Sequence, residues 1–469
     1  MSGHSVSPSG QIGADFTAGS IPKLLLRFAL PILLAQLLGS AYNMTDLIII
    51  GQFVGRAGTV AVTMGGKLLL LLTNISTGLA SGGQICISHH LGEHGHDACL
   101  RTHIGTLLSG TMLAAIGFSV LSYTLSPQIL RLLQTPAEAL DGACTYLRII
   151  SFGIPLLFGY NAIASALNGM GDSIRPLILI GAATVVNLTL DLILVGWVQL
   201  GITGAAIATV IGQGTAFLAS IFILYRGRAR TGFDFHPSAF RIHLPCLRQM
   251  LRIGVPIAGS QSLTTISQIV VVGFVNRYGL VAAAAYGIAD KIVSLLNIAS
   301  NSMKNASASV IGQNYGAKQY SRVHVTLRTA LRYAVPVALL LSVLSLLFPQ
   351  AFFRLFTPDA DVLAMASSLM VYAPAGFLLS SVLCAYGGAT IGLGRSDLVF
   401  LSGVMDSVVC RLLFCWLFGS ALHMGISGFF LGNAIARLGP ISIDMLYYYF
   451  GGWQSGRKAR KSTGHTPKT

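Results

Sequence analysis

Two carboxylates of this chain lie inside strongly apolar segments, where an ionised side chain is costly and therefore marks a candidate functional site. Asp46 lies in SAYNMTDLIII and Asp191 in VVNLTLDLILVG. On a helix, Asn187 and Asp191 would be neighbours at i and i+4, and Thr184 precedes Asn187 by three residues. Such a helix would present a hydroxyl, an amide and a carboxylate along one stripe.

A second polar pair follows on the next apolar segment, where Thr209 and Gln213 also have i, i+4 spacing. Oxygen ligands that converge in a dry cavity suit a hard monovalent cation, and a buried carboxylate can exchange its charge for a proton. The alternative is that Asp46 only lies at the membrane interface and that Asp191 is a buried acid satisfied by Asn187. Both interpretations are open from the sequence.

The second half of the chain has ionisable residues of its own within apolar segments: Asp290, Asp406, Arg411 and Arg437. They could contribute charge to a central cavity. We favour the alternative, in which Arg411 or Arg437 pairs with Asp406 inside the protein, because an unpaired charge at membrane depth is expensive.

The segment HHLGEHGHD, from His89 to Asp97, is rich in side chains that can bind metals. Its spacing does not match HExxH, and the corresponding segment of the second half, QNYGAKQY, has no histidine. We therefore expect a solvated loop here and no metal site.

The seven cysteines form no CxxC pair, which indicates packing residues and neither disulfides nor zinc ligands.

The elements that position these residues are predicted to be membrane-spanning helices. Hydrophobic residues make up 53% of the chain and charged residues 10%, which is typical of a polytopic membrane protein. The fold class is therefore all-α, with twelve transmembrane helices in two six-helix bundles. The predicted spans are 24–50, 58–86, 102–125, 142–166, 176–197, 201–225, 253–276, 280–310, 328–349, 363–390, 397–419 and 424–450.

The chain repeats itself at an offset of about 224 residues, which makes the two bundles pseudo-symmetric. GITGAAIATVIGQG, which begins at Gly201, corresponds to GISGFFLGNAIARL, which begins at Gly425. Membrane proteins built from two such halves commonly bind their substrate where the halves meet.

The net charge of +15 comes from Lys and Arg residues that are concentrated in alternate loops. This positive-inside bias places both termini and the central connector in the cytoplasm. Since topology explains the charge, we do not expect nucleic-acid binding. The predicted organisation is a cytoplasmic N-terminal segment (1–23), the first bundle (24–225), a cytoplasmic connector (226–252), the second bundle (253–450) and a basic tail (451–469).

Three elements in order carry a resemblance to a known family: YNMTDLIIIGQFVG, ALNGMGDSIRPLILIGAATVVNLTLDLILVG with GITGAAIATVIGQ, and ASVIGQNYGAKQYSR. From about Lys23 to about Tyr449 the chain resembles the multidrug and toxic compound extrusion (MATE) family. The resemblance implies a cation-driven antiporter of the inner membrane that exports amphipathic, often cationic compounds in exchange for H⁺ or Na⁺, without another cofactor and as a monomer. It also implies that Asp46, Asn187, Asp191 and Thr209 form the coupling site.

The chain departs from relatives that have a second cation site in the C-terminal half. Those relatives carry a Glu early in the seventh helix and an Asp in the tenth, whereas the corresponding regions here, GVPIAGSQSLTT and SSVLCAYGGATIG, contain no acid. Gln261 is the nearest polar substitute. We therefore expect coupling in the N-terminal half alone.

Two alternatives to a drug antiporter remain. A flippase or exporter of a lipid-linked or metabolite substrate on the same fold would be expected to have a basic cavity, which the acids Asp46 and Asp191 disfavour but Arg411 and Arg437 permit. An intramembrane prenyl or glycosyl transferase would need clustered acids for a metal diphosphate, and the sequence has no DDxxD. We therefore do not expect an enzyme.

Overall fold

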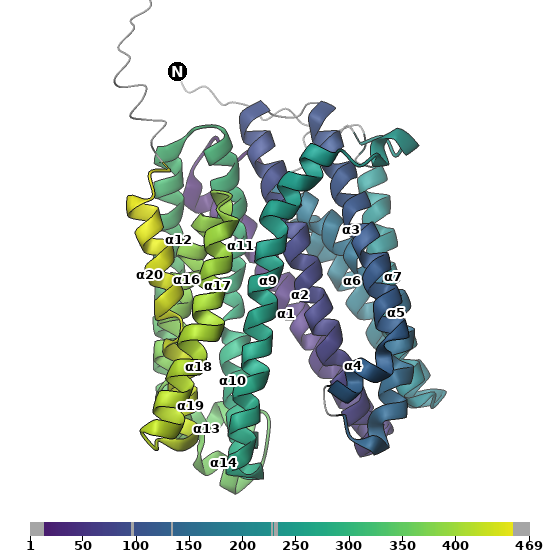
Figure 1. Cartoon of the computed structure of the whole chain (residues 1–469), viewed down its shortest axis with the longest axis vertical. Coiled ribbons are helices and arrows are strands. Elements are labelled where there is room, and N and C mark those ends of the chain that lie inside the picture. Colours follow the sequence, from purple (N-terminus) through teal and green to yellow (C-terminus); the bar gives the residue numbers. More distant parts are fainter. Residues whose placement is uncertain (1–13, 95–97, 133–134, 227, 229–232, 454–469) are drawn as a thin grey trace, which may run out of the picture. The chain divides into compact units, whose positions relative to one another are not determined.

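The computed structural model describes residues 14–94, 98–132, 135–226, 228 and 233–453, and within these ranges it contains helices and no strand. The all-α prediction is confirmed, as are twelve spans (Figure 1). The spans run over Ile21–Phe53, Val60–Glu93, Cys99–Thr124, Ala137–Gly169, Ile174–Trp197, Gly201–Arg226, Leu244–Tyr278, Val281–Gly316, Tyr320–Leu347, Ala373–Gly392, Ser396–Ala421 and Gly425–Phe450.

The chain forms two compact units, Met1–Thr265 and Ile266–Thr469, and the division falls inside the helix α9 (Leu244–Val275). The helices of the first unit before α9 are α1 (Ile21–Phe53), α2 (Gly55–His94), α3 (Ala98–Thr124), α4 (Ser126–Leu132), α5 (Ala137–Gly169), α6 (Ile174–Asp191), η1 (Leu192–Trp197), α7 (Gly201–Arg226) and η2 (Pro237–Phe240). The bundle boundaries drawn from the sequence remain a prediction.

The second unit has more and shorter pieces. They are η3 (Asn276–Tyr278), α10 (Leu280–Leu296), α11 (Ile298–Gly316), α12 (Tyr320–Leu347), α13 (Pro349–Arg354), α14 (Ala360–Ala364), α15 (Ala366–Met370), α16 (Ala373–Gly392), α17 (Ser396–Val404), η4 (Met405–Cys410), α18 (Arg411–Phe414), η5 (Cys415–Ala421), α19 (Gly425–Ile435) and α20 (Leu438–Phe450).

Three boundaries predicted from the sequence were wrong. Helix α2 continues to His94, so most of the loop expected around His89 is helical. Helix α9 begins at Leu244, before the predicted start of the span 253–276, because Cys246, Met250 and Ile253 recur at helical spacing and bury one face. The predicted span 363–390 begins too early, since 360–370 forms the separate short helices α14 and α15.

The connector before α9 packs on α3 in the first unit. The hydroxyl of Ser109 donates to the carbonyl of Phe240 at 2.7 Å, and Arg101 forms an ion pair with Asp234 at 3.0 Å. Gly105 allows this close approach, because a Cβ there would overlap the carbonyl oxygen of Ala239. The end of α3 nearest the connector is therefore covered by ordered chain.

Helix α2 meets the first part of α9 through small residues and polar side chains. A Cβ on Gly78 would lie 2.4 Å from the Cα of Ala258, so the two backbones touch. Beside this contact, Asn74 donates to Thr265 at 2.9 Å and Thr77 donates to Gln261 at 3.2 Å. Small residues and interhelical hydrogen bonds are the usual means by which helices associate in a membrane.

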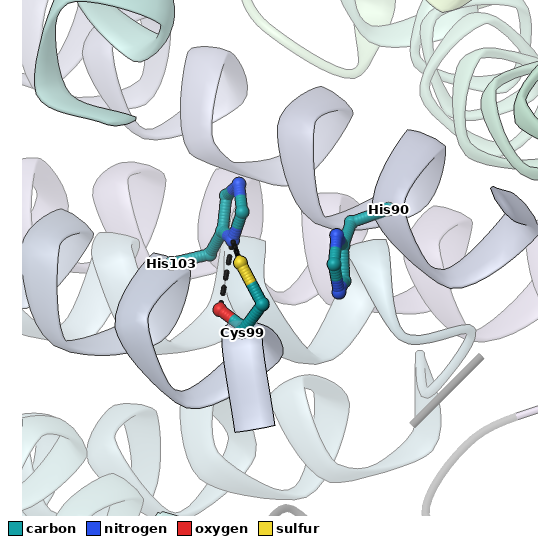
Figure 2. Close-up of side chains that lie close together, drawn as sticks. All are labelled: His90, Cys99 and His103. Atoms are coloured by element: carbon teal, nitrogen blue, oxygen red, sulfur yellow. Dashed lines mark hydrogen bonds between the residues drawn. The ribbon is translucent and has the colours of Figure 1, made fainter. Parts of the chain in front are cut away.

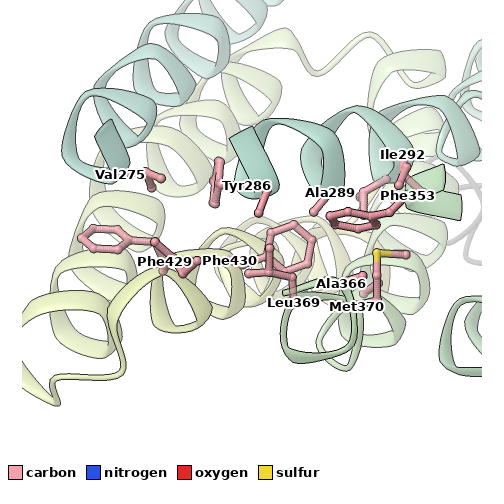
Figure 3. Close-up of a cluster of buried hydrophobic side chains, with 14 of the residues drawn as sticks. Val275, Tyr286, Ala289, Ile292, Phe353, Ala366, Leu369, Met370, Phe429 and Phe430 are labelled. Atoms are coloured by element: carbon pink, nitrogen blue, oxygen red, sulfur yellow. The ribbon is translucent and has the colours of Figure 1, made fainter. Parts of the chain in front are cut away.

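The core of the second unit is apolar and joins the end of α9 with residues of α10, α12, α13, α14, α15, α16, η5 and α19 (Figure 3). Phe353, Leu369 and Met370 are completely buried there, and Tyr286 meets the ring of Phe430 edge to face. The short helices α13, α14 and α15 contribute to this core instead of crossing the membrane.

The backbone repeats in the two units as the sequence does. Gln199 and Gly201 have positive φ angles of 59° and 56°, and their counterparts His423 and Gly425 have 53° and 60°. A π-helix precedes this turn in each unit, η1 in the first and η5 in the second. Since π-helical turns are rare and are often found at functional sites, their recurrence directs attention to the helices that carry them.

Candidate cation site

Asp46, Asn187, Asp191 and Thr209 are all buried in the first unit, with exposed fractions of 9%, 2%, 1% and 3%. Asp46 belongs to α1, Asn187 and Asp191 to α6, and Thr209 to α7. Helix α6 packs against both α1 and α7, so three neighbouring helices supply the four side chains. Asp191 is the last residue of α6 before the π-helix η1.

The contact between α6 and α7 depends on Gly212. A Cβ at this position would lie 2.9 Å from the Cβ of Asn187 and 3.4 Å from the carbonyl oxygen of Ala183. The missing side chain lets α7 approach α6 at the level of Asn187. The polar stripe of α6 is therefore held against α7 at close range.

The two acids interact electrostatically with each other. Within the described part of the chain, neither carboxylate oxygen of Asp191 and neither polar atom of the Asn187 amide has a hydrogen-bond partner. Buried polar groups without partners are costly, and a site that binds a cation or a proton is one accepted reason for them. The interpretation in which Asn187 merely satisfies Asp191 has no hydrogen bond to support it.

Two tyrosines that the sequence analysis did not single out complete the site. The hydroxyl of Tyr42 donates to Thr209 at 3.4 Å, and Thr209 in turn donates to the carbonyl of Ala205 at 2.9 Å. Tyr146, which is 2% exposed, interacts with the side chain of Thr209 and with both acids. Aromatic residues in an apolar helix give no sequence signal that separates them from ordinary core residues.

The accessory candidates of the first unit lie elsewhere or have other partners. Thr184 donates to the carbonyl of Ile180 in its own helix at 2.8 Å. Gln213 faces α5, where a Cβ on Gly153 would lie 2.3 Å from its Oε1. Gln261 accepts a hydrogen bond from Thr77 on α2 and so belongs to the contact between α2 and α9.

In the second unit the matching helices hold an ion pair. Arg411 is 2% exposed and donates both to the carboxylate of Asp406 and to the amide oxygen of Asn433. Asp406 and Arg411 are five residues apart, a spacing that an α-helix would turn to different faces. The π-helix η4 (Met405–Cys410) contains Asp406 and ends just before Arg411, and its wider turn with i to i+5 hydrogen bonds brings the two side chains toward one face.

Arg437 and Asp290 lie near this pair. Arg437 donates to the backbone carbonyls of Asn433 and Ala434 at 3.1 and 3.2 Å, and it interacts electrostatically with Asp406 and Asp290. The guanidinium also lines a small pocket together with Val293, Ala373, Gly376, Phe430, Asn433 and Ala434. The second unit therefore contains a basic pocket wall whose nearby acids partly neutralise it.

A further buried acid was missed by the sequence analysis. Asp444 on α20 is 2% exposed, and its Oδ1 accepts hydrogen bonds from Thr390 at 3.0 Å and from Ser402 at 3.1 Å. It also interacts electrostatically with Lys304. The sequence signal that could have found Asp444 is an acid within the predicted span 424–450.

Comparisons with known proteins agree on one family. The MatE family model matches residues 31–193 and 256–417. Two probable multidrug resistance proteins of Bacillus subtilis, YoeA and YpnP, are each 28% identical to the chain. The match to YoeA covers 77% of the chain and 79% of YoeA, and the match to YpnP covers 94% of the chain and 98% of YpnP. An FAD transporter of Shewanella oneidensis is 25% identical over 89% of the chain and 92% of that protein. A solved outward-facing MATE transporter has a TM-score of 0.86 at 20% identity, covering 97% of this chain and all of that one.

Proposed function

The chain belongs to the MATE family of multidrug efflux transporters, and from this premise we propose that it is an antiporter which exports amphipathic, often cationic compounds in exchange for H⁺ or Na⁺. It is a multi-pass membrane protein whose relatives are bacterial transporters. We place it in the inner membrane as a monomer with both termini in the cytoplasm.

One observation carries the proposal: Asp46, Asp191, Asn187 and Thr209 converge from three helices, and the acids and the amide keep buried oxygens without hydrogen-bond partners in the described chain. A proton on one carboxyl group would relieve the repulsion between the two acids, and a sodium ion among these oxygens would neutralise both. Either event lowers the free energy of the state in which the site is closed to water.

Coupling follows if the two states of the transporter bind the cation with different affinity. A ligand shifts a conformational equilibrium only by as much as it prefers one state. When the cation leaves toward the cytoplasm, the repulsion between Asp46 and Asp191 returns and favours the other state, to which substrate binds. The exchange of cation for substrate by alternating access therefore needs no covalent chemistry.

The test uses the purified full-length protein in lipid vesicles loaded with a fluorescent organic cation. We expect export when a proton or a sodium gradient is imposed, and no export without one. Imposing a sodium gradient at clamped pH, with a protonophore present, identifies the ion. Equal export with and without both gradients would overturn the proposal.

A second candidate substrate class is an anionic metabolite or a lipid-linked saccharide. It is favoured by the buried guanidinium group of Arg411 and by that of Arg437, which lines the small pocket of the second unit. One relative is named as an FAD transporter, so a flavin nucleotide is a suitable probe. Gradient-dependent export of that anion, with no export of the organic cation, would favour this class.

A further inference from the structure

We infer that His90, Cys99 and His103 form a binding site for a zinc-like transition metal ion at the corner between α2 and α3. His90 lies in the last turns of α2, and Cys99 and His103 lie in the first turns of α3. One potential ligand atom of each residue, a ring nitrogen or the thiol sulfur, lies within 4.8 Å of those of the other two. This site is separate from the acids proposed to couple transport.

The geometry comes from two helices that run side by side. Cys99 and His103 are spaced i, i+4 on α3 and so project from the same face. Figure 2 shows His90 reaching toward them from the neighbouring helix, with its imidazole ring facing that of His103. The two ring centroids are 4.9 Å apart, with an angle of 30° between the rings.

The distances are close to those of a metal centre. The Sγ of Cys99 lies 3.8 Å from the Nδ1 of His103. Bonds of about 2.3 Å to sulfur and about 2.0–2.1 Å to nitrogen at tetrahedral angles would separate two such ligands by roughly 3.5 Å. Small side-chain rotations would therefore close the shell without movement of either helix.

The same nitrogen of His103 also contacts the backbone. The Nδ1 of His103 lies 2.9 Å from the carbonyl oxygen of Cys99. In the metal-free protein this nitrogen can donate an N–H to that carbonyl, and a metal ion bound at Nδ1 would replace that proton. His103 is also 7% exposed, so the surrounding helices limit its rotamers.

Two imidazoles and one thiol are nitrogen and sulfur ligands, which favour Zn²⁺ and related borderline ions over Na⁺, Mg²⁺ or Ca²⁺. Three protein ligands leave a fourth position for water or an exchangeable ligand. A bound ion would join the end of α2 to the start of α3 and so stabilise this corner of the first unit. The sequence analysis expected no metal in the segment His89–Asp97. Of the three proposed ligands, only His90 belongs to that segment, and Cys99 and His103 follow it in the sequence.

Cobalt provides the probe, because Co²⁺ bound to a thiolate in a tetrahedral site gives an intense near-ultraviolet charge-transfer band and visible d–d bands. The full-length protein is purified in detergent with a tag that contains no histidine, reduced, stripped with a chelator and titrated with Co²⁺. We expect one equivalent to produce these bands, Zn²⁺ to remove them, and Zn²⁺ to raise the Tm.

Variants assign the ligands. Cys99→Ser should remove the charge-transfer band, and His90→Ala and His103→Ala should each weaken Co²⁺ binding at least tenfold. Cys144→Ser on α5 is the matched control and should leave the band unchanged. Apo-protein melting curves show that each variant is folded.

Absence of the bands from the wild-type protein would overturn the inference, as would a band that survives Cys99→Ser. Binding that is lost only in Cys144→Ser would also contradict it. Because the readout is a spectrum of the metal itself, the result does not depend on whether the protein transports drugs.

Discussion

Arg411 occupies in the second half of the chain the position that Asn187 occupies in the first, at the repeat offset of about 224 residues. Each makes its contact to the following span: Gly212 packs against Asn187, and Arg411 donates to Asn433, the counterpart of Thr209. The same backbone thus holds a neutral amide beside two acids in one unit and a guanidinium in the other. Since a guanidinium stays charged, we expect the coupling cation to bind at this position in the first unit and not in the second.

The first prediction concerns the charge of Asp191. Asp191→Asn keeps the volume of the side chain but cannot exchange a proton or neutralise a sodium ion. We expect gradient-driven efflux in lipid vesicles to be lost while expression and the melting temperature stay near those of the wild type. Asn187→Ala, which removes one ligand and no charge, should weaken the cation dependence more mildly. Full gradient-dependent efflux by Asp191→Asn would rule out this acid as the coupling group.

The second prediction concerns the helix contact at Gly212. Gly212→Ala places a methyl group 2.9 Å from the Cβ of Asn187, and because side-chain rotation does not move a Cβ, α6 and α7 must shift apart. We expect the cation concentration for half-maximal efflux to rise severalfold. Gly214→Ala, two residues further along α7, is the matched control, since its methyl group would meet Leu156 at an ordinary 3.5 Å. Equal behaviour of the two variants would show that this contact does not position the site.

How far the sequence reveals this site depends on the kind of residue. Asn187 and Asp191 could be found because an acid and an amide at i, i+4 stand out in an apolar helix. Tyr42 and Tyr146 could not, because aromatic residues are ordinary members of such helices and only their contact with Thr209 sets them apart. The three metal-ligand candidates also form no motif in the sequence. His90 lies on a different helix from Cys99 and His103, and only the packing of α2 against α3 brings the three together.

The ion pair of the second unit shows a different limit. The sequence suggested that Arg411 or Arg437 would pair with Asp406, yet a five-residue spacing does not fit one face of an α-helix. The π-helix η4 brings the two side chains together, and no pattern of residues in the sequence predicts a π-helix at this place.

The number of spans was predictable from hydropathy alone. Their ends were not, because packing of Cys246 and Met250 extends α9 beyond its most apolar part.

The third prediction tests this ion pair. Asp406→Asn leaves the guanidinium of Arg411 buried without its counter-charge, which should lower the free energy of unfolding by about 2–4 kcal/mol. Thermal melting in detergent measures the loss. Asp397→Asn is the matched control, because Asp397 pairs with Arg395 at 2.7 Å where both side chains are exposed, a pair worth about 0–1 kcal/mol.

The double variant Asp406→Asn with Arg411→Leu should recover most of the lost stability, since it removes the unpaired charge as well. A stable Asp406→Asn protein with a changed substrate preference would instead indicate that these charges act on the substrate.

The last prediction concerns Asp444, whose Oδ1 accepts hydrogen bonds from Thr390 and Ser402. Asp444→Asn keeps an oxygen for both hydroxyl groups and removes only the charge that faces Lys304, so we expect a small loss of about 1 kcal/mol. Asp444→Leu removes the acceptor of both hydroxyl groups; Thr390 can still donate to the carbonyl of Tyr386 at 3.1 Å, whereas Ser402 loses its bond to the acid, so the loss should be about 2–3 kcal/mol. Melting curves of the two variants, measured together, separate the hydrogen bonds from the charge. If Asp444→Asn were as destabilised as Asp444→Leu, the interaction with Lys304 would be the main contribution of this acid, and the two hydroxyl groups would be incidental neighbours.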